Sequence, residues 1–437
     1  MYRTAITKLE KWKNSKNRKP LVIYGSRQVG KTWLMREFGE KHYESVVYFS
    51  FDSDILYKKI FENDFNIVRI INELSIAAGI KISPETLIIF DEIQECPRAL
   101  TSLKYFNENA SEYQIITAGS LLGVISLEGT GFPVGKVDSF TMYPMSFYEF
   151  LEAIDNRFME ILKSHDFNTI STFHEIIIEL LKQYFYVGGM PAAVKVYAES
   201  RDFYEMRNVQ KIILDSYYAD FAKHIPAATI ARTRNIWNSV PTQLAKESKR
   251  FLYSDMKEGS RGRNYEAALD WLTSTNLIKL LHRVNLPNMP LIAYRQASVF
   301  KIYMNDIGLL SSLAGLIPQI YLDDNVKTFT HYKGGLTEQY VLQELLAADD
   351  SMPVFYWADE KNTSEVEFVL QYNGEIIPLE VKSGQNIKSR NLDTYRKKFQ
   401  PKISVRSSLK QFGRSNDLYS IPLYLIGSIK EIIGNTV

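Results

Sequence analysis

Eight residues near the N-terminus constrain this chain more than any other feature. The apolar, β-prone run Leu21–Tyr24 is followed by GSRQVGKT and then by a segment of helical character, Trp33–Phe38. Strand, GxxxxGK[ST] and helix in this order are what a phosphate-binding loop requires, because its glycines let backbone N–H groups turn toward phosphate oxygens at a helix N-terminus. We therefore predict that a nucleotide binds to Gly25, Ser26, Arg27, Gln28, Val29, Gly30, Lys31 and Thr32.

A second element, 86–92, supplies the acidic groups that nucleotide hydrolysis needs. Four apolar residues end in Asp91 and Glu92, and a continuous apolar run is typical of a strand buried in a parallel sheet. Catalytic residues gather at the carboxyl ends of such strands. We expect Lys31 to reach the β- and γ-phosphates, Thr32 and Asp91 to hold Mg²⁺, and Glu92 to activate the attacking water.

Further strands and helices alternate around these motifs. Strands are expected at 45–51 and 113–118, and helices at 65–78 and 97–110, which predicts a doubly wound parallel sheet of the α/β class. A polar residue at the end of the strand after Asp91 can sense the γ-phosphate. Thr117 and Ser120 both qualify, and we prefer Ser120 as a catalytic residue.

The motifs also identify a kind of ATPase. The sequence contains neither NKxD nor LSGGQ, which disfavours guanine-specific G proteins and ABC transporters. It resembles a prokaryotic AAA-type family, related to archaeal and STAND-like ATPases, through GSRQVGKT, LIIFDEIQECP, ITAGSLLG, PVGKV, YPMSFYEFL and YFYVGGMPAAV. The resemblance implies ATP and Mg²⁺ as cofactors. It also implies a helical lid whose Gly189 and Pro191 lie near the nucleotide base. Many relatives have Gly-Arg at Gly135-Lys136, so an arginine-finger role does not carry over to this position.

Length and composition set the wider limits. At roughly 150 residues per domain, 437 residues suggest about three domains, and a net charge of +2 gives no general reason to expect nucleic acid. One cysteine and six scattered histidines argue against disulfides and structural zinc, and a cytoplasmic protein without membrane spans is expected. We assign an ATPase core to 1–148, a helical lid to 149–225, a winged helix-turn-helix to 226–320 and a nuclease-like domain to 321–437.

The winged-helix assignment rests on short helices followed by strands. Helical pieces at 230–246, 254–256 and 264–275 precede strands at 277–284, 291–297 and 299–304, and the resemblance implies the same module through KIYMNDIGLL. Two roles are possible for this module. Its basic stretch could contact DNA, or the module could form a surface for self-association or for a protein partner. The second role is not excluded, because the predicted recognition helix carries Glu266 and Asp270 and no arginine. The stretch 246–263 holds six cations, namely Lys246, Lys249, Arg250, Lys257, Arg261 and Arg263, against three acids.

The C-terminal part contains a hairpin with opposed carboxylates. Strands at 365–371 and 376–382 flank Asn373-Gly374, which calls for a two-residue type I′ turn and places Glu367 opposite Glu380. Facing carboxylates repel, so a divalent cation or Lys382 must compensate. The pattern resembles the PD-(D/E)xK nuclease fold. That resemblance implies that Glu367 and Glu380 hold Mg²⁺, that Lys382 positions water, and that Glu338 is an additional acid.

Two outcomes remain for this second site, a competent nuclease or a silent scaffold, since relatives usually have Asp where Glu367 stands. For the whole chain we expect a Mg²⁺-dependent ATPase whose nucleotide state controls the downstream modules on or near DNA. The alternatives are a slow STAND-like nucleotide switch with a silent C-terminal scaffold, an ATP-gated DNA endonuclease, and a pure interaction scaffold.

Overall fold

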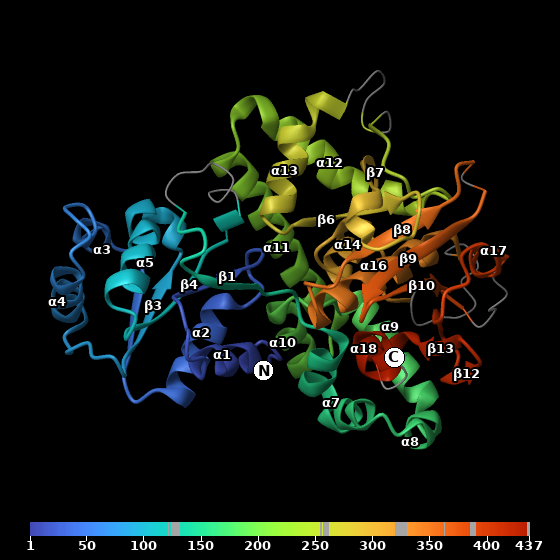
Figure 1. The fold of residues 1–437 in the computed structure, drawn as a ribbon, viewed down its shortest axis with the longest axis horizontal. Coiled ribbons are helices and arrows are strands. Elements are labelled where there is room, and N and C mark those ends of the chain that lie inside the picture. Colours follow the sequence, from blue (N-terminus) through green and yellow to red (C-terminus); the bar gives the residue numbers. More distant parts are fainter. Residues whose placement is uncertain are drawn as a thin grey trace. The chain divides into compact units, whose positions relative to one another are not determined.

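The chain forms two compact units (Figure 1). One unit consists of residues 3–142 with 274–277, and the other of residues 1–2, 143–273 and 278–437. The structure, a computed structural model, describes residues 1–120, 122–123, 132–253, 256, 262–319, 330–361, 363–384 and 390–434.

The unit containing the N-terminal motifs is built on a five-stranded sheet in the order β2-β3-β4-β1-β5, and every neighbouring pair is parallel. The predicted parallel α/β sheet is therefore confirmed. Because β4 lies between β1 and β3, the ends of the three strands that carry the motifs meet side by side. The strands are β1 (Leu21–Tyr24), β2 (Val46–Ser50), β3 (Leu87–Asp91), β4 (Gln114–Ala118) and β5 (Asp138–Thr141).

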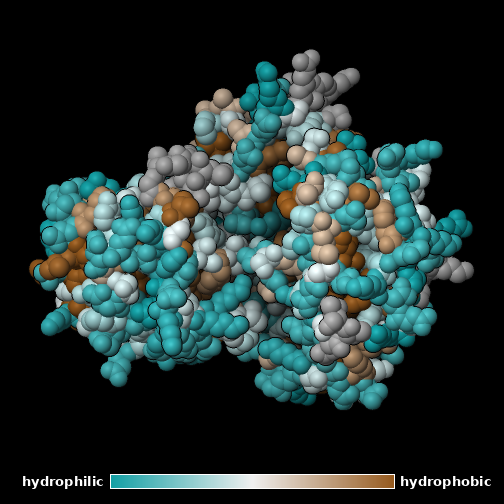
Figure 2. All heavy atoms as spheres, viewed as in Figure 1, coloured by the Kyte–Doolittle hydropathy of each residue, from teal (hydrophilic) through white to brown (hydrophobic). Residues whose placement is uncertain are grey.

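Helices cover this sheet and bury its apolar strands. All five residues of β3 are buried, as a strand covered on both faces requires. The outer helices leave an apolar patch exposed at Ile55, Leu56, Val68, Ile76 and Ile80, which Figure 2 shows near α3 and α4. The helices are α1 (Ile6–Lys13), α2 (Lys31–His42), α3 (Ile55–Ile60), α4 (Ile67–Ala78) and α5 (Pro97–Asn109).

The second unit begins with a run of helices, as expected for 149–225. A capping box between Ser146 and Glu149 starts the first of them. The helix predicted at 230–246 is confirmed as α12, which begins three residues earlier and accommodates Pro241, and the helix predicted at 264–275 is confirmed as α13. The helices are α7 (Phe147–Ser164), α8 (Phe167–Thr172), α9 (His174–Val187), α10 (Pro191–Ser200), α11 (Phe203–His224), α12 (Ala227–Ala245), α13 (Glu266–Ser274) and α14 (Ile307–Leu313).

An eight-stranded mixed sheet completes this unit, in the order β12-β13-β11-β10-β9-β8-β6-β7. Its strands are β6 (Ile278–Val284), β7 (Arg295–Met304), β8 (Val354–Ala358), β9 (Glu365–Tyr372), β10 (Glu375–Val381), β11 (Ser404–Ser408), β12 (Gly413–Ser415) and β13 (Leu418–Pro422). The helices α16 (Thr330–Ala348), α17 (Arg390–Phe399) and α18 (Ile429–Gly434) accompany it.

The predicted β9–β10 hairpin register is confirmed. Phe368 pairs with Leu379 and Leu370 with Ile377. Both turn residues, Asn373 and Gly374, have positive φ values, of 47° and 75°, as a type I′ turn demands.

The structure also joins two regions that the sequence assigned to separate domains. Strand β6 of the predicted wing pairs in parallel with β8 of the predicted nuclease-like domain. Val284 and Leu291 share a buried core with Trp357 and Tyr395. Leu291–Tyr294, expected as part of a strand, is a 3₁₀ turn, so the region predicted as a wing contains two strands, β6 and β7.

Within the described part of the chain, no helix has the length and apolar character needed to cross a membrane.

Candidate functional site

The loop between β1 and α2 has the backbone geometry of a phosphate cradle. Gly25, Gln28 and Gly30 all have positive φ values, of 141°, 66° and 95°. Two features exclude a side chain at Gly25. Its φ of 141° strains any other residue, and a Cβ there would lie 2.4 Å from the carbonyl oxygen of Met142. The buried guanidinium of Arg3 donates a hydrogen bond to the carbonyl oxygen of Val29 at 2.7 Å, which ties the loop down from outside.

Lys31 points back into this loop. Its Nζ donates to the carbonyl oxygens of Gly25 and Ser26, each at 2.8 Å. Burial lowers the pKa of Lys31 to about 8, although the carboxylates of Glu92 and Asp91 act in the opposite direction. A phosphate oxygen would be a stronger partner for this ammonium than a neutral carbonyl, so the loop and Lys31 fit a nucleotide phosphate.

Asp91 lies at the end of β3 within hydrogen-bond distance of two hydroxyls. Thr32 Oγ1 donates to Asp91 Oδ2 at 2.6 Å, and Tyr48 Oη donates to the same oxygen at 2.8 Å. Burial raises the pKa of Asp91, and these two hydrogen bonds lower it. A threonine hydroxyl beside a carboxylate at the loop's end is the oxygen donor set that fits Mg²⁺.

Tyr48 was not singled out from the sequence. It lies on β2, whose residues alternate between buried and half-buried, and its ring carries the guanidinium of Arg36 at 3.9 Å from the ring centre. It therefore joins α2 to Asp91 and fixes the carboxylate. We call it a positioning residue for the metal site, because its contact is with Asp91.

Replacing Tyr48 with phenylalanine is expected to raise the Mg²⁺ concentration at half-maximal ATP turnover by about tenfold, the value of one hydrogen bond to a charged group. The acidic limb of the pH profile should also move to higher pH, because the hydrogen bond that lowers the Asp91 pKa is lost. Mg²⁺ titrations of steady-state turnover measure both effects. Tyr57→Phe, whose ring packs on Phe49 from α3, is the matched control. An unchanged Mg²⁺ requirement in Tyr48→Phe would contradict the positioning role.

Glu92 follows Asp91 directly and lies beside the end of β4. Gln94 Nε2 donates to Glu92 Oε2 at 2.5 Å, and the backbone N and Oγ of Ser120 lie 3.5 Å from the same oxygen. The structure thus brings Ser120 next to Glu92, whereas Thr117 is buried within β4. Gln94 was missed by sequence reasoning, although it lies in the quoted IQECP string. A Cβ on Gly119 would meet its Oε1 at 2.0 Å, so Gly119 gives it room.

The lid residues expected near the nucleotide base belong to the other unit. Gly189 N donates to Asp306 Oδ2 at 2.6 Å, and its carbonyl accepts from Met145 N at 2.6 Å. Pro191 is the first residue of α10. Asp306, whose pKa burial raises to about 6, also caps α14. The contact of Gly189 and Pro191 with a nucleotide stays a prediction. Lys136 of the Gly135-Lys136 pair forms an ion pair with Glu108 at 2.9 Å.

The predicted second site forms a cluster of carboxylates and lysines. Glu338 on α16 contacts Lys249 at 2.9 Å and Lys301 at 3.3 Å, and Lys301 also contacts Glu365 at 2.6 Å. Lys382 pairs with Glu380 at 2.5 Å, as expected if this lysine compensates one of the two facing carboxylates. Lys301 and Lys249 were not foreseen as members of this cluster. Lys301 lies on β7, which joins the sheet of the hairpin through the pairing of β6 with β8, and Lys249 belongs to the basic stretch considered above for DNA contact.

Glu367 lies in the middle of this cluster. It accepts a hydrogen bond from Val381 N at 3.1 Å. Burial, together with Glu380 and Glu338, raises the pKa of Glu367 well above its usual range. Across the described residues, no three His, Cys, Asp or Glu side chains are arranged to hold a metal ion. Of the two groups expected to compensate the facing carboxylates, a divalent cation or Lys382, the structure shows the lysine paired with Glu380.

The basic stretch at 246–263 is only partly within the described residues, since 254–255 and 257–261 lie outside them. Lys249 is directed to Glu338. On α13, Glu266 and Asp270 are exposed, so the helix predicted for recognition presents acidic groups.

Comparison with known proteins divides the chain into three parts. Residues 17–151 match an AAA domain. Residues 178–319 and 333–426 match two domains of unknown function, DUF8612 and DUF4143. Two curated proteins, the uncharacterized protein Rv2008c of Mycobacterium tuberculosis and Mb2031c of Mycobacterium bovis, are each 27% identical over 169 residues. That segment is 39% of this chain and spans about a third (35%) of each relative.

Solved structures show more distant similarity. The Walker-type ATPase PABY2304 of Pyrococcus abyssi is 16% identical with a TM-score of 0.45, over 70% of this chain and 94% of its own. The STAND protein PH0952 of Pyrococcus horikoshii is 13% identical with a TM-score of 0.29, over 80% of this chain and 47% of its own. The family match and the parallel sheet with its phosphate-binding loop lead to one conclusion: residues 17–151 are a P-loop ATPase domain of the AAA type.

Proposed function

We propose that this protein is a Mg²⁺-dependent ATPase whose nucleotide state controls its winged-helix-like and C-terminal modules on or near DNA. One observation carries the proposal. The P-loop lysine, the Thr32–Asp91 pair and Glu92 converge at neighbouring strand ends of one parallel sheet. That is the set of groups that phosphoryl transfer to water needs.

Each residue has a distinct part in the proposed mechanism. The loop amides and Lys31 bind and orient the phosphates, and the Lys31 charge stabilises the negative charge that develops on them. Thr32 and Asp91 would hold Mg²⁺, which neutralises phosphate charge when bound. Glu92 accepts the proton of the attacking water, and Ser120 lies close enough to Glu92 to respond to the γ-phosphate. Gln94 and Ser120 contact only Oε2 of Glu92, so its Oε1 can accept a hydrogen bond from the attacking water.

The C-terminal cluster favours the silent scaffold over the ATP-gated endonuclease. A nuclease of the resembled fold needs carboxylates free to bind Mg²⁺. Here Glu338, Glu365 and Glu380 are each engaged by a lysine. We infer that this domain reads out the ATPase state through contacts and not through cleavage. Incubating the protein with plasmid DNA and Mg²⁺ or Mn²⁺ tests this, and nicking that Lys382→Ala abolishes would restore the nuclease alternative.

Replacing Lys31 with alanine is expected to abolish tight ATP binding and to lower turnover at least about 100-fold, because both phosphate orientation and charge stabilisation are lost. ATP affinity by titration and phosphate release at saturating ATP are the measurements. Lys41→Ala removes an exposed lysine from the same helix and should leave both values unchanged.

Turnover also separates the remaining alternatives. Parent turnover far below once per second, with ATP retained through purification, would favour the slow switch. Parent protein that binds no ATP would leave only the interaction scaffold.

A further inference from the structure

The segment from α17 to the β12–β13 hairpin is strongly basic, in contrast to the nearly neutral chain. Residues 390–417 contain eight cations, and the only acids among them are Asp393 and Asp417. Figure 2 shows mostly hydrophilic surface at the edge of the unit where Figure 1 labels α17. Six of the eight cations are exposed, namely Arg390, Lys397, Lys398, Lys402, Lys410 and Arg414.

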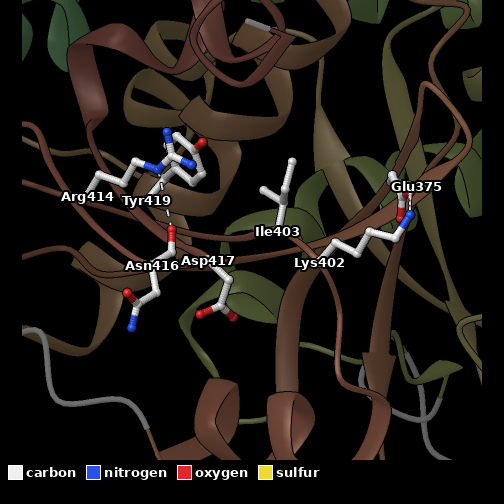
Figure 3. A pocket seen from close by; sticks show the side chains of 7 residues that line it. All are labelled: Glu375, Lys402, Ile403, Arg414, Asn416, Asp417 and Tyr419. Carbon is white, nitrogen blue, oxygen red and sulfur yellow. Dashed lines mark hydrogen bonds and ion pairs between the residues drawn. The ribbon is translucent and has the colours of Figure 1, made fainter. Parts of the chain in front are cut away.

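Two hollows lie side by side on this surface, and Asp417 borders both. One has a volume of about 250 Å³ and is lined by Lys402, Arg414 and Asn416, among others (Figure 3). The other, of about 410 Å³, lies at the end of α17 and is lined by Lys397 and Gln400. Cations and neutral hydrogen-bonding groups line both hollows together with the carboxylates of Glu375, Asp393 and Asp417. We call the two neighbouring hollows and the exposed cations around them the α17 surface.

The cations of the α17 surface are arranged for an external anion. Arg396 is neutralised by two contacts with Asp417, at 2.7 and 2.8 Å. Lys402 pairs with Glu375 at 2.5 Å, but its side chain is 78% exposed, and an ion pair this exposed contributes little stability. A phosphate can therefore replace Glu375 at little cost. Arg414 lies 4.7 Å from the ring centre of buried Tyr419, which orders its guanidinium before any ligand binds.

We propose that the α17 surface binds the phosphate backbone of nucleic acid. Affinity for nucleic acid comes mainly from Lys and Arg contacts with phosphates, supported by neutral polar groups such as Asn416. The inference rests on the proposed action near DNA and assigns that action to a surface outside the predicted winged helix.

A protein partner fits the same surface less well. Protein interfaces are anchored by aromatic and aliphatic side chains and are depleted in lysine. None of the exposed large hydrophobic side chains of the described chain lies at 390–434. The predicted recognition helix is also a weaker candidate, since it exposes Glu266 and Asp270 and its neighbour Lys249 is taken by Glu338.

The test compares DNA binding by the parent with that of the triple variant Lys397→Gln, Lys402→Gln, Arg414→Gln. Fluorescence anisotropy with labelled single-stranded and duplex DNA is measured in the full chain across salt, from about 50 to 200 mM. We expect the variant to bind at least about tenfold more weakly at low salt, and its slope of log affinity against log salt to fall by about 2 to 3. A control with the same charge change, Lys195→Gln, Lys211→Gln, Arg232→Gln on α10, α11 and α12, should bind like the parent.

Several outcomes overturn the inference. The first is unchanged DNA binding in the α17 variant. The second is loss of DNA binding only in a triple variant of the basic stretch, Lys246→Gln, Arg250→Gln, Arg263→Gln. The third is displacement of DNA by polyglutamate at equal charge concentration, which indicates an acidic protein partner. ATP turnover without DNA is measured on the same samples. A parent that hydrolyses ATP but does not bind DNA would contradict the inference and leave the ATPase proposal standing. A parent that binds DNA through the α17 surface but does not hydrolyse ATP would contradict the ATPase proposal and leave the inference standing.

Discussion

Replacing Glu92 with glutamine is expected to lower ATP turnover by about 10²- to 10³-fold while ATP still binds. Glutamine keeps the size of the side chain and can still bond to Gln94, but it cannot accept a proton from water. The phosphate contacts come from the loop and from Lys31, on other elements, so binding should survive. Loss of turnover without loss of binding distinguishes a catalytic base from a residue that only supports the fold.

The control for this experiment lies three residues away. Glu95→Gln removes a carboxylate from the short 3₁₀ turn that follows Glu92, and its turnover should match the parent. Single-turnover measurements with bound ATP separate hydrolysis from product release. Normal hydrolysis in Glu92→Gln would show that the base is a different group, and loss of ATP binding would show that the Glu92 side chain maintains the loop.

Local patterns were enough to predict the nucleotide-binding unit. GSRQVGKT specifies a turn that only glycine tolerates at Gly25, and the apolar run before Asp91 specifies a strand buried on both faces. The β9–β10 register also followed from sequence, because Asn373-Gly374 selects one turn and a slip of one residue would exchange the two faces. In each case a few neighbouring residues fix the structure by backbone sterics or by burial.

Pairings between distant segments could not be predicted in the same way. No local pattern indicates that β6 joins β8, because the parallel pair Arg283–Tyr356 links segments about 70 residues apart. From the sequence, Tyr48 cannot be distinguished from any other tyrosine on a strand. Its role appears only because β2 pairs with β3, which brings the Tyr48 hydroxyl within hydrogen-bond distance of Asp91. Lys301 likewise reads as the one charged residue in the apolar run 299–304, and the sequence does not show that it is fully buried between Glu338 and Glu365.

That burial makes Lys301 the residue whose loss should cost the most stability. Replacing Lys301 with methionine is expected to destabilise the unit that contains it by about 3–5 kcal/mol. Glu365 then loses its lysine, and Glu338 keeps only one of its two lysines, Lys249. Denaturant unfolding of the parent and the variant, both without nucleotide, measures the change in the unit that contains Lys301. Lys195→Met, which breaks an exposed pair with Glu199, should cost less than about 1 kcal/mol.

The same cluster predicts how acid acts on the parent. Burial alone would raise the pKa of Glu338, but Lys301 and Lys249 outweigh it and lower the pKa from 4.5 to about 2. The folded state therefore holds this proton less tightly than the unfolded chain. The stability gained, on the order of 3 kcal/mol, is present above pH 4.5 and is lost as the pH falls through about 2. Lys301→Met should remove much of this acid dependence.

A variant that removes the lysine and its carboxylate partners together tests whether the cluster is a structural core or a metal site. Lys301→Met combined with Glu338→Gln and Glu365→Gln should recover most of the lost stability, because neither of the two groups that contacted Lys301 then carries an uncompensated charge. Added Mg²⁺ should not stabilise the single variant Lys301→Met if the cluster is a structural core. If Mg²⁺ restores its unfolding midpoint, these carboxylates can bind a metal ion once Lys301 is removed. In the parent, Lys301 would then be the group that takes the place of a cation among these carboxylates.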